Sequence, residues 1–166
     1  MIRRALAALL VFAGAASAQV ASRDDAAAFE RGLAAYLTDD PQSAWFFWLG
    51  PAERGFAEAQ FSLGVLYLHG EGVPADPVLA KRWFERAAAT GHARAELNLA
   101  LMLSAGHGGP RDLVAAYILA MRAAGKLDGD ERREARAVAA TIARHMSGDE
   151  AERARRQLME GSGPRR

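Results

Sequence analysis

Four histidines are the side chains of this 166-residue sequence most suited to metal binding or proton transfer. His69 and His107 occupy neighbouring positions in two copies of a repeat described below, with Glu71 near the first, so both are expected on one edge of the fold. A metal ion could bridge them only if that edge folds inward. The spacing His-Glu-x-x-His, which places two zinc ligands on one helix face, is absent. The sequence therefore favours solvated histidines without a shared metal, and the same holds for His92 and His145.

The nucleophiles needed for acyl transfer are missing or lack their motif. The chain has no cysteine, so it has neither a thiol nucleophile nor a disulfide. None of its serines begins Ser-x-x-Lys or lies in Gly-x-Ser-x-Gly, the patterns that place a serine in a catalytic setting. We therefore expect no catalytic residue and no cofactor.

A glycine-rich segment, residues 70–77, could suggest a phosphate-binding loop. Such loops follow a strand and continue as Gly-Lys-Ser/Thr or GxGxxG, and neither feature is present. Gly70 can adopt the left-handed conformation that ends a helix, and Pro74 prevents the helix from resuming. Asp76 followed by Pro77 is typical of an N-cap with a proline in the first turn. The segment is therefore predicted to connect two helices.

The residues around this connector recur 36 positions later without an insertion. Twelve positions between Ala57 and Ala88 carry the same residue one period on. A fixed period of this size indicates a stacked repeat array, in which each unit leaves an apolar face for its neighbour to cover. The connector residues Gly70, Gly72, Pro74 and Asp76 return as Gly106, Gly108, Pro110 and Asp112.

Each repeat is predicted to form two helices. In the first, residues 57–68, apolar side chains follow two nearly opposite stripes, as expected for a helix packed between neighbours. Gly64 lies within one stripe, where a glycine costs about 1 kcal/mol but lets another helix approach closely. The second helix, residues 77–90, alternates large residues such as Trp83 and Phe84 with alanines, which favours close antiparallel packing.

These residues resemble the Sel1-like repeats, a subclass of the tetratricopeptide-type helical repeats with a longer loop between the helices. Residues 93–125 keep the connector but have Ala100 for the glycine and Leu103 for the tyrosine. The resemblance implies an all-α fold, an α-solenoid of stacked helix-turn-helix repeats that binds proteins, and it implies no reaction. Besides the connector, it is carried in residues 57–92 by Ala59, Phe61, Leu63, Gly64, Tyr67, Ala80, Trp83, Phe84, Ala87, Ala88 and Gly91.

Residues 29–56 are predicted to form a degenerate first repeat, which completes a repeat domain over residues 19–125. The second-helix pattern is present from Asp40 onward, but the glycines of the connector are missing. Pro51 should end or kink this helix after about Trp48.

The aromatic run at residues 45–48 could be a ligand platform. Core packing is favoured, with at least one of the four rings at the surface or under the N-terminal arm, because four consecutive side chains cannot all face one core.

The first 18 residues have the pattern of a secretory signal peptide, with Arg3 and Arg4, an apolar run, and Ala-Ser-Ala before Gln19. The run is shorter than the ~20 residues that a spanning helix needs, so no stable membrane anchor is expected.

Two of the 21 basic residues lie in this first segment, so 19 basic residues remain in the rest of the chain against 20 acidic ones. This balance disfavours nucleic acid as a partner. The alanine-rich exported chain suggests a periplasmic or secreted protein.

After the repeats, residues 126–160 are predicted to form two capping helices and residues 161–166 a disordered tail. The first of these helices is amphipathic, with Ala135, Val138, Ala139, Ile142 and Met146 on its apolar face. Ser147 and Glu150 have the spacing of a capping box before the second helix. The two helices are expected to cover the end of the stack, with a charged partner-binding tail as the alternative.

The sequence thus predicts a monomeric, non-enzymatic adaptor or regulator of an envelope process that binds a protein or peptide. One rival is a hydrolase or binder of β-lactams or cell-wall peptides, an activity linked to some cysteine-rich Sel1-like proteins. Another is one subunit of a larger solenoid. The partner-binding residues can be predicted by analogy with tetratricopeptide hairpins, in which the first helix of each hairpin lines the groove. The candidates are Glu58, Phe61, Val65, His69, Arg94, Leu97 and Leu101. Two of them, Phe61 and Leu97, are equally compatible with packing between helices.

Overall fold

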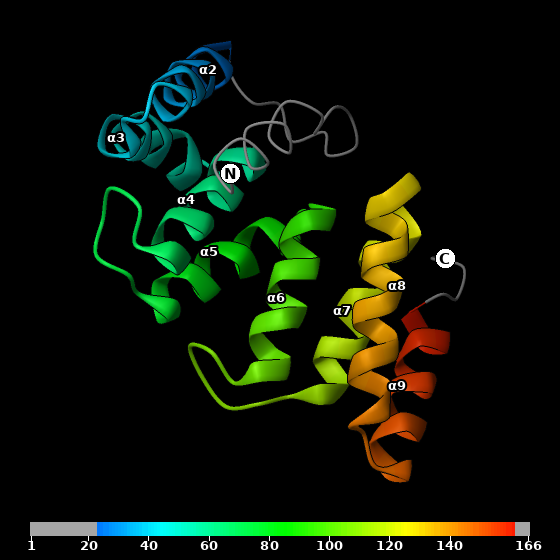
Figure 1. The fold of residues 1–166 in the computed structure, drawn as a ribbon. Coiled ribbons are helices and arrows are strands. Elements are labelled where there is room, and N and C mark those ends of the chain that lie inside the picture. Colours follow the sequence, from blue (N-terminus) through cyan, green and yellow to red (C-terminus); the bar gives the residue numbers. More distant parts are fainter. Residues whose placement is uncertain (1–22, 162–166) are drawn as a thin grey trace. The chain divides into compact units, whose positions relative to one another are not determined.

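A computed structural model describes residues 23–161 of the chain (Figure 1). Within these residues the chain forms eight α-helices of 13 to 16 residues and no strand. The predicted all-α fold of paired helices is therefore confirmed. The predicted signal peptide lies outside the described residues, as does the predicted tail beyond Gly161.

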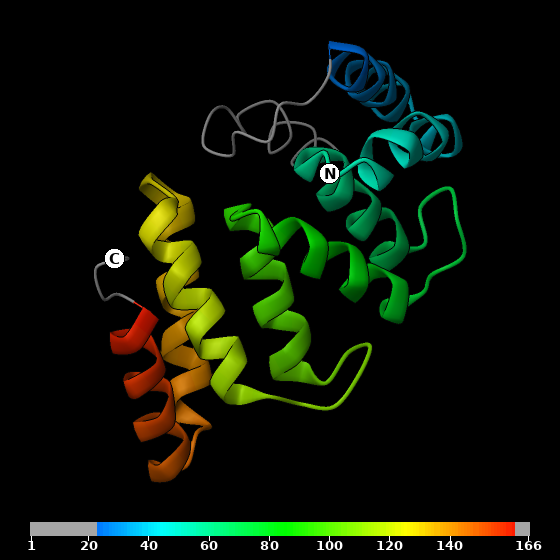
Figure 2. The ribbon, with the colours of Figure 1, turned by 180° about the vertical axis from the view of Figure 1, so that it is seen from behind.

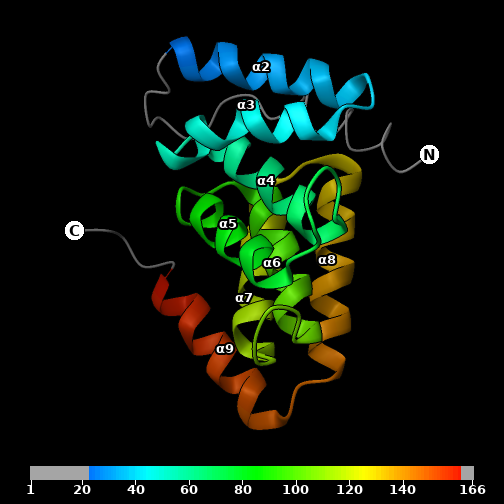
Figure 3. The ribbon, with the colours of Figure 1, turned by 90° about the vertical axis from the view of Figure 1, so that its left-hand side faces the viewer.

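The chain divides into two compact units at residue 95. In the first unit each helix packs against the next in chain order. Figure 3 shows its first two helices as antiparallel neighbours, the arrangement of a helical hairpin. The helices of this unit are α2 (Arg23–Leu37), α3 (Pro41–Glu53), α4 (Ala57–His69) and α5 (Pro77–Ala89).

The second unit contains most of α6 (Ala93–Ala105), followed by α7 (Leu113–Lys126), α8 (Gly129–Arg144) and α9 (Gly148–Gly161). Helices α8 and α9 both pack against α7 (Figure 1 and Figure 2). Ala154 of α9 is fully buried. The apolar faces predicted for the two C-terminal helices are therefore covered within this unit. Ala100 of α6 shares a core with Leu113, Ala116 and Ala120 of α7 and with Ala139 and Ile142 of α8.

A glycine on the first helix of each hairpin in the first unit receives a large ring from the second helix. Gly64 of α4 lies against Phe84 of α5, and Gly32 of α2 lies against Trp48 of α3. Both rings are fully buried. Helix α4 buries nine of its thirteen residues, as predicted for a helix packed on two sides. The predicted role of Gly64 in close helix approach is confirmed, and Gly32 repeats it in the degenerate hairpin.

The connectors at residues 70–76 and 106–112 have the same backbone geometry. Gly70 and Gly72 have φ angles of 70° and 72°, and the two glycines 36 positions later both have 75°. These values lie in the left-handed region that favours glycine. In each connector the amide of the final aspartate donates to the carbonyl nine residues earlier, at 2.9 Å and 3.0 Å. The turn on which the repeat prediction depends therefore occurs twice.

Each connector ends at an aspartate that caps the following helix. Asp76 Oδ1 accepts hydrogen bonds from the amides of Val78 and Leu79, both at 2.9 Å. Asp112 Oδ1 accepts one from the amide of Ala115, also at 2.9 Å. A cap of this kind contributes typically about 1 kcal/mol. The N-cap predicted from Asp76 is confirmed.

The first hairpin differs in the course of its second helix. Of the two outcomes predicted for Pro51, an end or a kink after about Trp48, the end does not occur, because α3 continues to Glu53 with Pro51 inside it. A proline removes one helical hydrogen bond and crowds the preceding turn. Here the burial of Pro51 and the bond from the Phe56 amide to the Pro51 carbonyl, at 3.0 Å, keep the last turn helical.

Buried carboxylates near the start of α2 and α6 pair with basic residues at the ends of α3 and α7. Asp25 is 5% exposed and accepts from Arg54 Nε at 2.7 Å, a contact that raises the pKa of Arg54 above its usual range. Glu96 is 2% exposed and accepts from Lys126 Nζ at 2.7 Å. The middle repeat has neutral Gln60 where the third has Glu96.

Candidate interaction site

Most of the predicted groove residues lie in the first unit, and two of these are buried. Phe61 and Val65 are 4% and 3% exposed. The Phe61 ring lies 5.8 Å from the Phe84 ring and stacks on His92 at 4.8 Å, so it belongs to the packing of its repeat. His69 is exposed, whereas Glu58 and Arg94 are half-buried.

Two further groove candidates, Leu97 and Leu101, lie on α6 in the second unit. Leu97 is 7% exposed, whereas Leu101, one turn later, is 42% exposed. Leu101 lines an open pocket of about 250 Å³ between the C-terminal half of α6 and α8. The other lining residues are Ser104 of α6 and Glu134, Ala137, Val138, Thr141 and Ile142 of α8.

This pocket has an apolar floor and a polar rim. Ile142 is buried and Val138 packs against the core of the unit, so they form the floor. Glu134 and Thr141 are exposed and form the rim. A surface of this kind can accept an apolar side chain while rim groups bond a main chain. We name the pocket and Leu101 together the α6/α8 groove.

The first connector rests on the hairpin that precedes it. Tyr36 Oη donates to Glu71 Oε2 at 2.7 Å. A Cβ placed on Gly72 would lie 2.5 Å from the carbonyl carbon of Pro41, so the two backbones are in direct contact. The carboxylate of Glu71 thus helps to hold two hairpins together.

The aromatic run at the start of α3 divides between core and surface. Trp48 is fully buried, whereas Phe46 is 71% exposed. The indole N–H of Trp45 donates to the hydroxyl of Tyr67 at 3.0 Å. The rings of Phe46 and Phe47 meet edge to face at 5.8 Å. The prediction that at least one of the four rings reaches the surface is confirmed, and the contacts of Trp45 and Trp48 serve packing.

The histidines of the described residues are not grouped into a metal site. His69 and His107 are exposed. His92 Nδ1 accepts from the amide of Ala95 at 3.2 Å, and this bond helps to start α6. Within residues 23–161 no three His, Asp or Glu side chains are grouped so that they could hold a metal ion.

Comparison with known proteins identifies the repeat. The family model for the Sel1 repeat matches residues 57–92 and 93–126. A search of curated proteins finds no match. Among solved structures, the chain resembles c5321, a protective antigen present in uropathogenic Escherichia coli strains that displays an SLR fold, with a TM-score of 0.76 and 21% identity. It also resembles a Sel1 repeat protein from Oxalobacter formigenes, with a TM-score of 0.59 and 32% identity.

The matched region is a part of each of those proteins. The alignment with c5321 covers 95% of this chain and 36% of that chain, and the alignment with the Oxalobacter protein covers 64% and 44%. The likeness to c5321, at 21% identity, concerns the fold. Each of the two matched segments, residues 57–92 and 93–126, contains one of the two connectors with the same backbone geometry. Residues 57–126 therefore match two copies of the Sel1 repeat, and the all-α fold of paired helices is similar to that of the solved SLR and Sel1 repeat proteins.

Proposed function

We propose that this protein is a non-enzymatic interaction module that holds a protein or peptide partner in the α6/α8 groove. The Sel1-repeat fold generally mediates protein–protein interaction and is generally a non-enzymatic scaffold. We assign the interaction to the α6/α8 groove because Leu101 is exposed there beside the buried side chain of Ile142. A partner side chain seated there would remove apolar surface from water, which is the main favourable term in association.

The charges around the α6/α8 groove suit a polypeptide partner. Among the described residues that line the pocket, Glu134 is the one with a charge, and none is basic. Nucleic acids are held chiefly by Lys and Arg contacts to phosphate. We therefore propose a protein partner and no nucleic acid.

We place this interaction in the bacterial periplasm or outside the cell, with the protein acting as a monomeric adaptor or regulator in the envelope. The support is the basic, apolar and Ala-x-Ala sequence of residues 1–18. None of the helices over residues 23–161 combines the length and the apolar character that a membrane span requires. Cell fractionation with N-terminal sequencing tests the location. A mature chain in the periplasmic fraction that begins at Gln19 is the expected result, and an uncleaved cytoplasmic chain contradicts it.

Affinity capture with matched variants tests the function. Leu101→Glu places a charge in the α6/α8 groove, and Met121→Glu places one on α7 at a side chain that is 38% exposed. We expect the wild type and Met121→Glu to retain the same partner and Leu101→Glu to lose it, with unchanged helical content. Retention of the partner by Leu101→Glu contradicts the groove assignment. Nitrocefin turnover by the purified protein would favour the hydrolase alternative instead.

A further inference from the structure

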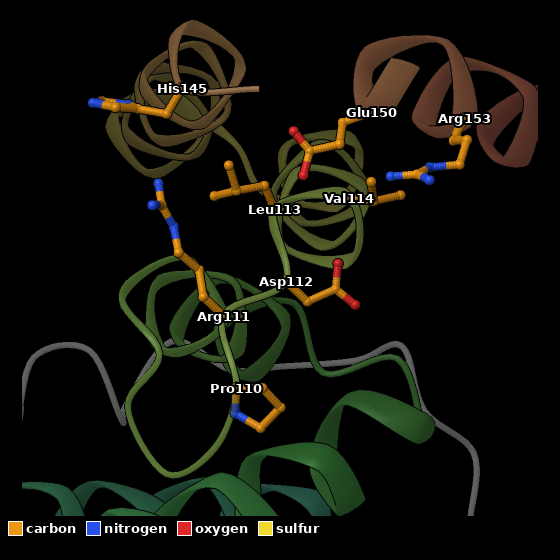
Figure 4. A pocket seen from close by; sticks show the side chains of 8 residues that line it. All are labelled: Pro110, Arg111, Asp112, Leu113, Val114, His145, Glu150 and Arg153. Carbon is orange, nitrogen blue, oxygen red and sulfur yellow. The ribbon is translucent and has the colours of Figure 1, made fainter. Parts of the chain in front are cut away.

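A second cleft lies in the same unit, where the connector before α7 meets the end of α8 and the start of α9 (Figure 4). Its volume is about 580 Å³, within the range of about 300–1,000 Å³ that ligand pockets span. Leu113 and Val114, at the start of α7, give it an apolar side. The charged groups around it are Arg111, Asp112, Glu150 and Arg153.

Both carboxylates of this cleft already serve as helix caps. Asp112 Oδ1 accepts from the amide of Ala115 at 2.9 Å at the start of α7. Glu150 Oε2 accepts from the amide of Ser147 at 2.7 Å at the start of α9. The Ser147 amide, the Ser147 hydroxyl and the nearby arginines hold the pKa of Glu150 below its usual range. Each carboxylate is thus balanced in part by the positive end of the helix that it caps.

The two arginines of the cleft have no such partner. Arg111 and Arg153 are exposed, and within residues 23–161 neither guanidinium makes an ion pair or a hydrogen bond. Figure 4 shows the Glu150 carboxylate between the two guanidinium groups. The two arginines and the two helix N-termini, each N-terminus worth about half a positive charge, outweigh the two carboxylates and the C-terminus of α8 by about half a charge. The cleft therefore offers two guanidinium groups to an anionic ligand.

We propose that this cleft binds an acidic segment of the partner, with one partner carboxylate on Arg111 and a second on Arg153. The inference rests on the proposed function and adds the chemistry of the partner. Guanidinium groups bind carboxylates through two parallel hydrogen bonds, which fix both position and orientation.

The carboxylates of the cleft favour a peptide over a nucleic acid. Asp112 and Glu150 lie between and beside the arginines, where a continuous row of phosphates would meet them. An acidic peptide can space its carboxylates around Glu150 and turn main-chain N–H groups toward it. Val114, which is half-buried at the edge of the cleft, can contact an apolar side chain of the same segment.

Peptide selection on the purified protein tests this assignment. A random heptapeptide library is selected against the wild type, and affinities of the recovered peptides are measured by fluorescence anisotropy. The test variant is Arg111→Gln/Arg153→Gln. The matched control is Arg155→Gln/Arg156→Gln, which removes the same charge from exposed positions of α9 that do not line the cleft.

We expect peptides rich in Asp and Glu that lose about tenfold in affinity on the test variant, while the control stays within about twofold. Selected peptides without acidic residues, or an equal loss on both variants, would overturn the proposal. A single-stranded oligonucleotide could also bind the wild type more tightly than the peptides do and lose this affinity on the test variant. That result would overturn the assignment of a peptide as the ligand of the cleft. Leu101→Glu should leave the affinity of the cleft peptides unchanged, so loss of partner capture and loss of peptide binding report on separate sites.

Discussion

The ring of Phe84 occupies the space that a side chain on Gly64 would need. A Cβ placed on Gly64 would lie 2.6 Å from Phe84 Cε1, well inside van der Waals contact. The same relation joins Gly32 and Trp48, where a Cβ would lie 2.3 Å from the indole Nε1. The two hairpins of the first unit are therefore closed by the same device, a large ring against a bare helix backbone.

Gly64→Ala should destabilise the protein even though alanine is the better helix former. Forcing the fully buried Phe84 ring aside costs about 1–3 kcal/mol, and the gain in helix propensity is at most about 1 kcal/mol. Gly125→Ala is the matched control, because Gly125 lies in α7 and a methyl group on it would have no neighbouring atom within 4 Å. Urea unfolding should show a lower midpoint for Gly64→Ala and an unchanged or higher midpoint for Gly125→Ala. Equal midpoints for the two variants would contradict the contact.

Gly72→Ala should be more damaging than Gly106→Ala. Both residues have positive φ angles, 72° and 75°, so both variants bear the left-handed penalty of about 1–2 kcal/mol. A methyl group on residue 72 also overlaps the Pro41 backbone at 2.5 Å, whereas the nearest atom to one on residue 106 is 3.5 Å away. Thermal unfolding should therefore give the larger loss for Gly72→Ala. A larger loss for Gly106→Ala would show that the first connector does not rest on α3.

Local signals in the sequence account for most of the fold. The turn glycines and the capping aspartates act within a few residues, so their patterns predict the helices and connectors directly. Gly64 contacts Phe84 of the next helix, and its place within an apolar stripe is the signal that predicts this close approach. The capping box of Ser147 and Glu150 is likewise confirmed by reciprocal bonds of 2.7 Å and 3.2 Å. Helix α3 does not end before Pro51, because a rule about local hydrogen bonding is outweighed by burial that depends on the neighbouring helices.

The site can be predicted only in part, because it depends on which helices become neighbours. The position of Leu101 on the first helix of a repeat is enough to make it a candidate. Its neighbours on α8 do not follow from the sequence, which assigns residues 126–160 to a cap and does not place α8 beside α6. The cleft at Arg111 and Arg153 lies between a connector and the start of a helix about 40 residues later. Rules about residue spacing apply within one helix, so they do not predict that these two arginines line the same cleft.

Lys126→Met should destabilise the second unit because it leaves the buried carboxylate of Glu96 without its ammonium partner. We expect a loss of about 1–3 kcal/mol, as for a buried acceptor left unsatisfied. The loss should fall short of the roughly 3–5 kcal/mol typical of breaking a fully buried pair, because the Lys126 side chain is 41% exposed. Adding Glu96→Gln, the residue type found at Gln60, should restore much of the stability in denaturant unfolding. A double variant as unstable as Lys126→Met would contradict this account.

The start of α9 should lose protection in acid. Because Ser147 lowers the pKa of Glu150 from its ordinary value of 4.5, the charged form stabilises the folded state. This contribution is present above pH 4.5 and is lost as the pH falls through the lower native pKa. Amide-exchange protection at Ala151 should fall over that range in the wild type, and Glu150→Gln should remove this part of the pH dependence. The same pH profile in both proteins would exclude the capping box as its source.

Site-specific photo-crosslinking in cells tests the central claim, that a partner polypeptide docks in the α6/α8 groove. A benzophenone amino acid replaces Leu101 in one variant and Met121 in the other, two exposed apolar positions on α6 and α7. We expect a discrete protein adduct on irradiation of the Leu101 variant and none with the Met121 variant. Adducts of the same protein at both positions, or at Met121 alone, would contradict it.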